Sequence, residues 1–249
     1  MSDNSLVIIA GRNAVREALE RSPASIEKVY LQKEIKGLNP IRNVAIRAGV
    51  PVKFLPLSGL QRLAGGVIHQ GAIAVESAFS YWDYSKLLSN IASDLNMTRE
   101  LCPRILLLDG IQDPRNFGAI IRSAVAFDVK GIIVSSHHMA PVSTSTIKSS
   151  SGAALRIPIA RVGRLADIIP ELKERGYYVY GASSTGTISM WYINWQCPVV
   201  LIIGSEDRGL YPDTERLCDE LFSIPMTGDI ESLNASVATG IVLAVASKP

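Results

Sequence analysis

The stretch from Asp109 to Asp128 reads DGIQDPRNFGAIIRSAVAFD and decides the fold of the second half of the chain. It follows the apolar run Ile105-Leu106-Leu107-Leu108, which predicts a buried strand. A turn rich in Gly, Asp and Pro comes next, and Asn116 is placed to cap a helix over residues 116–127 with its side-chain oxygen. Strand, polar turn and helix in this order predict an α/β unit.

The predicted helix has one apolar stripe, formed by Phe117, Ile120, Ile121, Ala124 and Val125. Gly118 and Arg122 lie four residues apart on a common face, off that stripe. Because a helical side chain leans toward the helix N-terminus, Arg122 is expected to project over the turn that starts at Gly118. Gly118 has no side chain, so a ligand is expected to approach the backbone there.

Composition limits the class of protein. The chain has 249 residues, 47% hydrophobic and 19% charged, which is enough for a core in one large or two small domains. No run of about 18 apolar residues occurs, so no membrane span is expected. The N-terminus lacks the basic region of a secretory signal. Three widely spaced cysteines favour reduced thiols in a cytoplasmic protein, with no disulfide frame and no zinc spacing.

Neither histidines nor net charge indicate a ligand. Of the three histidines, His137 and His138 are adjacent, and adjacent residues rarely share one ion, so no metal site is expected. The net charge is only +2, which does not by itself indicate a nucleic-acid partner. It does not exclude one, because nucleic-acid binding depends on local basic patches.

Two α/β units are expected, separated by a linker. Residues 1–77 predict a small domain with strands at 6–9, 26–31, 52–54 and 71–75, and helices at 12–19, 39–48 and 57–63. Residues 78–102 are interpreted as a linker with a connecting helix. Residues 103–249 predict a parallel sheet covered on both faces, with strands at 105–109, 131–134, 156–159, 177–181, 199–203 and 221–224. Helices are expected there at 116–127, 164–175, 212–218 and 235–247, and a flexible loop at 143–151.

A second motif follows the apolar run Val199–Ile203 and reads Gly204-Ser205-Glu206-Asp207-Arg208-Gly209. The carboxyl end of a strand in a parallel sheet is a common place for a ligand site. Two glycines five residues apart let the loop fold tightly. No Gly-Lys-Ser/Thr follows and the third glycine of the dinucleotide fingerprint is missing, which argues against a phosphate loop and a Rossmann site.

A third motif begins with Phe222-Ser223-Ile224-Pro225-Met226 and continues as Glu231-Ser232-Leu233-Asn234-Ala235-Ser236-Val237. A short strand is expected to stop at Pro225, followed by a polar loop and a helix of small residues. Taken alone, Ser232 and Asn234 are ordinary helix N-cap residues. The helix has few bulky polar groups, so we expect it to be largely buried and in close contact with another helix.

Together the three motifs resemble those of the SpoU (TrmH) family of RNA ribose 2′-O-methyltransferases. The matching pattern is Asn116-x-Gly118-x-x-x-Arg122, then Gly204-x-Glu206-x-x-Gly209, then Ile224-Pro225-Met226 with Ser232-Leu233-Asn234. The resemblance covers residues 103–249. Gly11-Arg12-Asn13-Ala14-Val15 and His69-Gln70-Gly71 extend it to the L30e-like substrate-binding domain of the RlmB-type subgroup.

The resemblance implies a SPOUT fold with a trefoil knot, a homodimer, and methyl transfer from S-adenosylmethionine to a ribose 2′-hydroxyl. A guanosine in 23S ribosomal RNA is the substrate it favours. It implies a cofactor site lined by Gly204, Ile224, Leu233, Met226 and Ser183, and catalytic roles for Arg122, Asn116, Glu206, Ser232 and Asn234. Candidate RNA contacts are Arg115, Lys148 and Arg12, of which phosphate contacts give affinity more than sequence choice.

Two roles for Arg122 stay open. A free guanidinium holds its proton at any ordinary pH. Arg122 therefore either loses its proton in its bound environment and acts as the base, or stays charged, grips a phosphate and stabilises the developing alkoxide.

Three other functions compete with this prediction. A transfer RNA ribose methyltransferase would use the same chemistry, although the L30e-like domain favours structured ribosomal RNA. A non-catalytic RNA-binding protein, such as an assembly factor, is disfavoured because the catalytic side chains of all three motifs are present. A nucleotide-binding oxidoreductase is disfavoured by the missing glycine.

Overall fold

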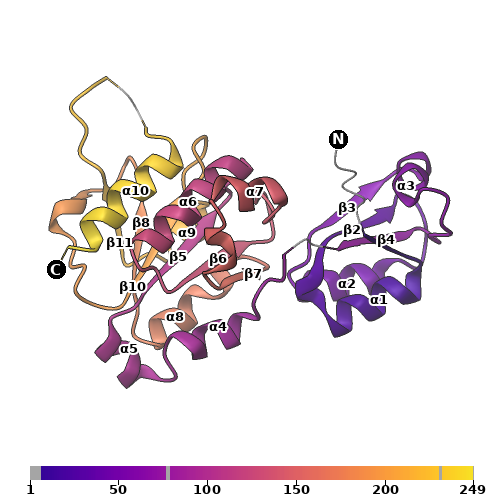
Figure 1. The fold of residues 1–249 in the computed structure, drawn as a ribbon, viewed down its shortest axis with the longest axis horizontal. Coiled ribbons are helices and arrows are strands. Elements are labelled where there is room, and N and C mark those ends of the chain that lie inside the picture. Colours follow the sequence, from indigo (N-terminus) through magenta and orange to yellow (C-terminus); the bar gives the residue numbers. More distant parts are fainter. Residues whose placement is uncertain (1–6, 77–78, 230–231, 249) are drawn as a thin grey trace. The chain divides into compact units, whose positions relative to one another are not determined.

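The computed structural model describes residues 7–76, 79–229 and 232–248. The chain forms two compact units, Met1–Tyr81 and Trp82–Pro249, each with its own sheet (Figure 1). Three expectations fall outside the described residues: Leu6 at the start of the first strand, the domain boundary at residue 77, and Glu231 of the third motif. No helix within the described ranges has the length and apolar character needed to cross a membrane.

The first unit is a four-stranded mixed sheet with helices on both faces. Strands β1 (Ile8–Ala10), β2 (Ile26–Gln32), β3 (Val52–Leu55) and β4 (Ala72–Glu76) lie in the order β1-β4-β2-β3. β4 runs antiparallel to both of its neighbours, and β2 runs parallel to β3. Helices α1 (Arg12–Arg21) and α2 (Asn39–Arg47) cover one core with Val15, Leu19 and Ile41, and α3 (Leu57–Ala64) covers a second with Leu60. The predicted small α/β domain is confirmed.

The second unit contains seven parallel strands in the order β7-β6-β5-β10-β8-β11-β9. Their bounds are β5 (Arg104–Asp109), β6 (Gly131–Ser135), β7 (Ile159–Val162), β8 (Tyr178–Ala182), β9 (Ile188–Ser189), β10 (Val199–Gly204) and β11 (Glu220–Ser223). The central strands β5, β6 and β10 are almost wholly buried. The expected parallel sheet is confirmed; the two-residue strand β9 was not predicted.

Helices cover both faces of this sheet, which explains why its strands are apolar on both sides. Their bounds are α4 (Tyr84–Ile91), α5 (Leu95–Leu101), α6 (Pro114–Ala126), α7 (Thr144–Ser149), α8 (Ile169–Glu174), α9 (Pro212–Glu215) and α10 (Ala235–Ala246). Figure 1 shows α6, α7 and α10 on one face and α4 and α8 on the other. On the latter face Leu87, Leu107 and Leu172 belong to one buried cluster.

The segment 78–102, expected as a linker, contributes two helices to the second unit. Leu87, Leu88 and Ile91 of α4 lie in the core beneath β6 and β7. Asp94 caps α5, accepting the amide protons of Asn96 and Met97 at 2.9 and 3.0 Å. Much of the expected linker is therefore part of the folded second unit.

The predicted start of α6 was wrong. Asp113 is the N-cap residue, and its carboxylate accepts the Arg115 amide proton at 2.7 Å. Pro114 takes the first helical position, where its fixed backbone dihedral suits the helix and its missing N–H has no intrahelical partner to lose. Asn116 is therefore inside the first turn, and its side chain is available for other contacts. Val125, expected on the buried stripe, is only partly buried.

The serine-rich run 143–151, expected as a flexible loop, forms α7. Ser143 caps this helix by accepting the Thr146 amide proton at 3.3 Å. Thr146 is fully buried and donates to the Pro141 carbonyl oxygen at 2.9 Å. Composition misleads here because hydroxyl side chains that usually favour loops can instead satisfy a cap and nearby backbone carbonyls. The strand expected at 156–159 starts instead at Ile159, because Pro158 has no N–H for a ladder.

Gly118 serves helix packing, in contrast to the expected approach of a ligand. It is buried in α6, and a Cβ placed on it would lie 2.8 Å from the Thr146 carbonyl oxygen and 2.9 Å from the Ser149 Cβ, both in α7. The glycine therefore lets α6 and α7 pack backbone to backbone.

We expect Gly118→Ala to destabilise the second unit by about 1–3 kcal/mol, because the added methyl group has to displace the α7 backbone. Chemical denaturation followed by circular dichroism measures this change. The matched control is Gly163→Ala, where an added Cβ meets nothing within 4 Å and the backbone is not left-handed. Equal midpoints for the two variants would contradict this account of the α6–α7 contact.

Candidate active site

The candidate site lies at the carboxyl ends of the central strands of the second unit. β5 and β10 are neighbours, and Asp109 at the end of β5 is opposite Gly204 at the end of β10. From β5 the sheet continues through β6 and β7 on one side, and β10 is followed by β8 on the other. In open α/β sheets such a change of direction leaves a crevice in which ligands bind.

The second motif forms a closed loop at this edge. Ser205 and Gly209 form a small antiparallel bridge, with N–H to O distances of 3.0 and 2.9 Å. Gly209 has a left-handed backbone (φ 69°), which a glycine adopts without strain. The loop folds back so closely that a Cβ on Gly204 would meet the backbone of Gly209 and would lie 2.5 Å from the Leu210 nitrogen. The two glycines are thus needed for the loop itself.

Glu206 joins all three motifs through a single carboxylate oxygen. Its Oε1 accepts from Asn116 Nδ2 at 2.6 Å, from Asn234 Nδ2 at 2.7 Å and from the Ala235 amide at 3.2 Å. Asn234 Nδ2 also lies 3.3 Å from Asn116 Oδ1. The oxygen of Asn234 caps α10 by accepting the amide protons of Ser236 and Val237. The predicted capping role of Asn234 is confirmed, and its amide group ties the cap to the other two motifs.

A cavity of about 450 Å³ opens beside this network. All five predicted cofactor residues line the cavity: Gly204, Ile224, Leu233, Met226 and Ser183. Glu206 and Ser232 line it as well. Leu210 and Phe222 add apolar wall. The backbone groups of Leu233 have no hydrogen-bond partner within the described residues, so they are free to bind a ligand. Apolar walls with a few free backbone groups suit a flat heterocycle such as adenine.

Arg122 is not among the residues that line this cavity. Arg122 lies six residues after Asn116 on α6 and points about 120° away from it around the helix axis. It is on the same helical face as Arg115. No described residue pairs with its exposed guanidinium. Two partners were open for Glu206, Arg122 and the Asn234 amide, and the structure shows the second. Asn116 was expected to hold either Arg122 or the ribose, and within the described residues it binds Glu206 and not Arg122.

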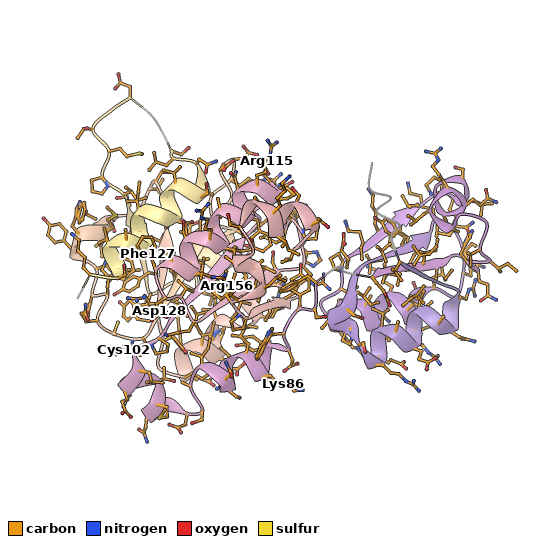
Figure 2. The ribbon with its side chains drawn as sticks, in the orientation of Figure 1. Lys86, Cys102, Arg115, Phe127, Asp128 and Arg156 are labelled. Atoms are coloured by element: carbon orange, nitrogen blue, oxygen red, sulfur yellow. The ribbon has the colours of Figure 1, made fainter. Side chains whose placement is uncertain are left out.

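The candidate RNA contacts lie on different elements. Arg115 and Lys148 are exposed, on α6 and α7 respectively, and these two helices pack together. Figure 2 shows Arg115 at the opposite end of α6 from Phe127. Arg12 belongs to the first unit, where its Nε donates to the Gln70 carbonyl oxygen at 3.0 Å.

Asp109 supports the site without lining the cavity, and from the sequence it was expected only as the end of a strand. It is 3% exposed, and its Oδ2 accepts the Tyr211 amide proton at 3.0 Å, which holds the far end of the second motif against β5. Burial raises the pKa of the Asp109 carboxyl above its ordinary value, although the Tyr211 amide opposes this shift. A carboxylate that ends the apolar run Ile105–Leu108 inside a buried strand is the signal that could have identified it.

Comparisons with known proteins find similarity in both units of the chain. The SpoU rRNA methylase family model matches residues 103–244, and the model for RNA 2′-O ribose methyltransferase substrate binding matches residues 8–82. A 23S rRNA (guanosine-2′-O-)-methyltransferase, RlmB, from Xanthomonas campestris pv. campestris is 36% identical over 94% of this chain and 93% of its own length.

Two solved structures are also similar. The AdoMet-bound rRNA methyltransferase from Sinorhizobium meliloti shares 25% identity with a TM-score of 0.58, covering 96% of this chain and 85% of that one. The TrmH/SpoU tRNA modifying enzyme of A. aeolicus shares 26% identity with a TM-score of 0.53, covering 65% of this chain and 83% of that one. The first likeness includes both units of this chain.

Proposed function

Because the chain belongs to the SpoU family and is an S-adenosylmethionine-dependent RNA ribose 2′-O-methyltransferase, we propose that its substrate is a guanosine in 23S ribosomal RNA. The observation that carries this proposal is the match of both units to a 23S rRNA guanosine methyltransferase over 94% of the chain. The similarity to the tRNA modifying enzyme covers only 65% of this chain. A ribosomal RNA substrate also implies that the enzyme works in the cytoplasm.

The cavity beside the second motif is the proposed cofactor site. Its volume of about 450 Å³ is within the usual range for sites that enclose small ligands. Leu233 and Phe222 would bound the adenine, while the free backbone groups of Leu233 would bind its polar edge. When bound there, S-adenosylmethionine supplies an electrophilic methyl group for the ribose oxygen. The trefoil knot implied by the resemblance fits the family to which the chain belongs.

The proposed roles of the polar residues follow from their contacts. Glu206 holds Asn116 and Asn234 together and so positions the turn that carries Ser232 at the cavity. Ser232 and the two asparagines then complete a polar wall against which a ribose can be oriented. Positioning of this kind lowers the barrier because the reactants no longer lose orientational freedom at the moment of reaction.

We assign Arg122 the role of a charged stabiliser rather than that of a base. A free guanidinium keeps its proton at ordinary pH. Its free donors suit a phosphate next to the target ribose and the charge that develops on the 2′-oxygen. Arg115 on the same face and Lys148 on the adjacent helix are proposed to bind neighbouring phosphates.

A homodimer is part of the proposal. Large apolar side chains are exposed near the cavity: Val237 on α10 is 50% exposed, and Met226, which lines the cavity, is 39% exposed. Trp191 and Tyr192, in the turn Met190–Tyr192 that contacts α10, are 57% and 84% exposed. Exposed apolar surface of this kind marks interaction sites. Light scattering on the purified protein measures its mass, and a monomer at all concentrations would contradict this assembly.

Leu233→Asp is expected to weaken S-adenosylmethionine binding by at least about tenfold, because the change puts a charge into the apolar part of the cavity. Isothermal titration calorimetry measures the affinity. Met97→Asp is the control, since Met97 is 38% exposed on α5 and does not line the cavity. The cofactor assignment fails if the two variants bind the cofactor equally well.

Methylation mapping tests the substrate. Ribose methylation is read across ribosomal and transfer RNA in cells without the gene, and again after the gene is restored. We expect one guanosine of 23S RNA to lose its methyl group and then regain it. Loss at a transfer RNA position instead would assign the enzyme to the second substrate class.

A further inference from the structure

Two of the three cysteines lie at the amino ends of the central strands β5 and β10, at the edge of the sheet opposite the candidate active site. Figure 2 shows Cys102 far from Arg115, which lies at the start of α6. The ladder between the two strands begins with Val199 paired to Arg104. Cys197 and Cys102 come two residues before this pair, so they enter the sheet at the same level. Adjacent strands lie about 4.8 Å apart, which is within the Cα separations of about 4.4–6.8 Å that a disulfide spans.

Local contacts place the two thiols beside each other. Cys102 has a left-handed backbone (φ 43°) and ends α5, so the chain turns sharply there before it enters β5. Its Sγ lies 3.7 Å from the carbonyl oxygen of Gln196, the residue before Cys197. Burial raises the pKa of the Cys197 thiol, and the negative charge of a Cys102 thiolate raises it further. A charge has this effect only on a nearby group, so the two sulfur atoms are neighbours.

The third cysteine is separate from this pair. Cys218 packs against the buried cluster that includes Leu107 and Leu172, on the sheet face covered by α4 and α8. Arg104, next to the pair, contacts α10 on the other face. Burial raises the pKa of the Cys218 thiol to about 12. Because the thiolate is the reactive form of cysteine, Cys218 is expected to stay inert toward oxidants.

The residues next to the thiol pair hold the end of the last helix. Arg104 Nη1 donates to the Ala246 carbonyl oxygen at 2.6 Å, and Gln196 Nε2 donates to the Lys248 carbonyl oxygen at 3.1 Å. Ala246 is the last residue of α10, and Lys248 follows it closely. A covalent bond between the two thiols would therefore join β5 to β10 at the point where the end of α10 is anchored.

We propose that Cys102 and Cys197 form a dithiol site that peroxides convert to an intramolecular disulfide, which reinforces the start of the central strands. Both side chains are partly exposed, so a small oxidant can reach them. The site takes no part in methyl transfer, and the proposal does not depend on which RNA is the substrate. In a reducing compartment the pair would stay reduced and would close only during oxidation.

The chemistry balances with hydrogen peroxide as the oxidant. The sulfur of one thiolate attacks a peroxide oxygen, the O–O bond breaks, and a sulfenic acid forms while the released hydroxide takes up the thiol proton as water. The second sulfur then attacks the first, the S–O bond breaks, and a second water leaves with the second thiol proton. Two electrons pass from the thiols to the peroxide. Exchange with a small thiol such as glutathione restores the dithiol.

Thiol mapping of the full-length protein tests the proposal. The folded protein is treated with hydrogen peroxide, its remaining thiols are alkylated under denaturing conditions, and peptides are analysed by mass spectrometry without reduction. We expect the free thiols to fall from three to one per chain, with Cys102 linked to Cys197 and with Cys218 alkylated. Dithiothreitol should restore all three thiols. Cys218→Ser should form the same disulfide, whereas Cys102→Ser and Cys197→Ser should form none.

The thermal midpoint gives a second measurement. A disulfide that closes a long loop should raise the midpoint of the wild type and of Cys218→Ser by about 5 °C or more on oxidation. Cys102→Ser should show no such rise. The proposal is overturned if the two thiols stay free or are overoxidised without linking, if they link to Cys218 or to a second chain, or if the disulfide forms and the midpoint does not rise. Neither measurement uses methyl transfer, so failure of the proposed RNA substrate would leave this result unaffected.

Discussion

Arg122→Ala should abolish most methyl transfer, with kcat reduced about 10²–10³-fold, the usual effect of removing one donor that stabilises charge in a transition state. Affinity for S-adenosylmethionine should stay within about twofold of wild type, because Arg122 does not line the cofactor cavity. Single-turnover methylation of 23S RNA measures the rate, and calorimetry measures the affinity. A catalytic loss with intact cofactor binding distinguishes a residue of the reaction from one of the cofactor site.

Two further variants complete this experiment. Arg122→Lys keeps the charge but loses the forked donor geometry, so it should recover only part of the rate. Arg99→Ala removes an exposed arginine from α5, away from all three motifs, and controls for the loss of one positive charge. If Arg122→Ala turns over as fast as Arg99→Ala, the central catalytic assignment is wrong.

Glu206→Ala should reduce methyl transfer almost as much as Arg122→Ala does, but for a different reason. The change removes an acceptor shared by Asn116, Asn234 and the Ala235 amide. Hydrogen bonds to charged groups contribute about 1.5–3 kcal/mol each, and they are not additive. We expect kcat/KM to fall about 100-fold, which corresponds to about 2.7 kcal/mol. Cofactor affinity should fall as well, because the turn with Ser232 and Leu233 loses its anchor.

A double-mutant cycle isolates this effect. Glu206→Gln keeps an acceptor oxygen and should lose only about tenfold, while Asn234→Ala combined with Glu206→Ala should cost much less than the sum of the two changes. Glu100→Ala, an exposed carboxylate on α5, is the control for charge. Additive losses would show that Glu206 and Asn234 act independently, which would contradict the network.

The periodicity of the sequence was enough to predict the architecture. Apolar runs such as Ile105–Leu108 and Val199–Ile203 can only be buried between two helical layers, and the structure places β5 and β10 side by side. It was harder to predict which of several suitable residues caps a helix. Asn116 and Asp113 are both good caps, and Pro114 between them decides in favour of Asp113. The serines of α7 likewise depend on partners that composition does not reveal.

For the site, the sequence identified the residues but not their contacts. The resemblance implied that Gly204, Leu233 and Ser183 would lie together, and they line one cavity. It could not predict that Gly118 meets α7, because that contact depends on how two helices cross. Nor could it predict that Glu206 binds Asn116 while Arg122 has no partner among the described residues, since side-chain partners depend on directions around α6 that only the tertiary structure fixes.

The shared oxygen of Glu206 also has a consequence for biosynthesis. Its partners are 90 residues earlier and 28 residues later in the chain. Contacts of such long sequence separation form late in folding, because distant segments must first be brought together. A nascent chain still inside the ribosomal tunnel beyond residue 206 would therefore carry an unfinished catalytic centre. Methyl transfer should become possible only after Asn234 has left the ribosomal tunnel and has bound Glu206. Formation of α10 would therefore set the time at which the new enzyme becomes active.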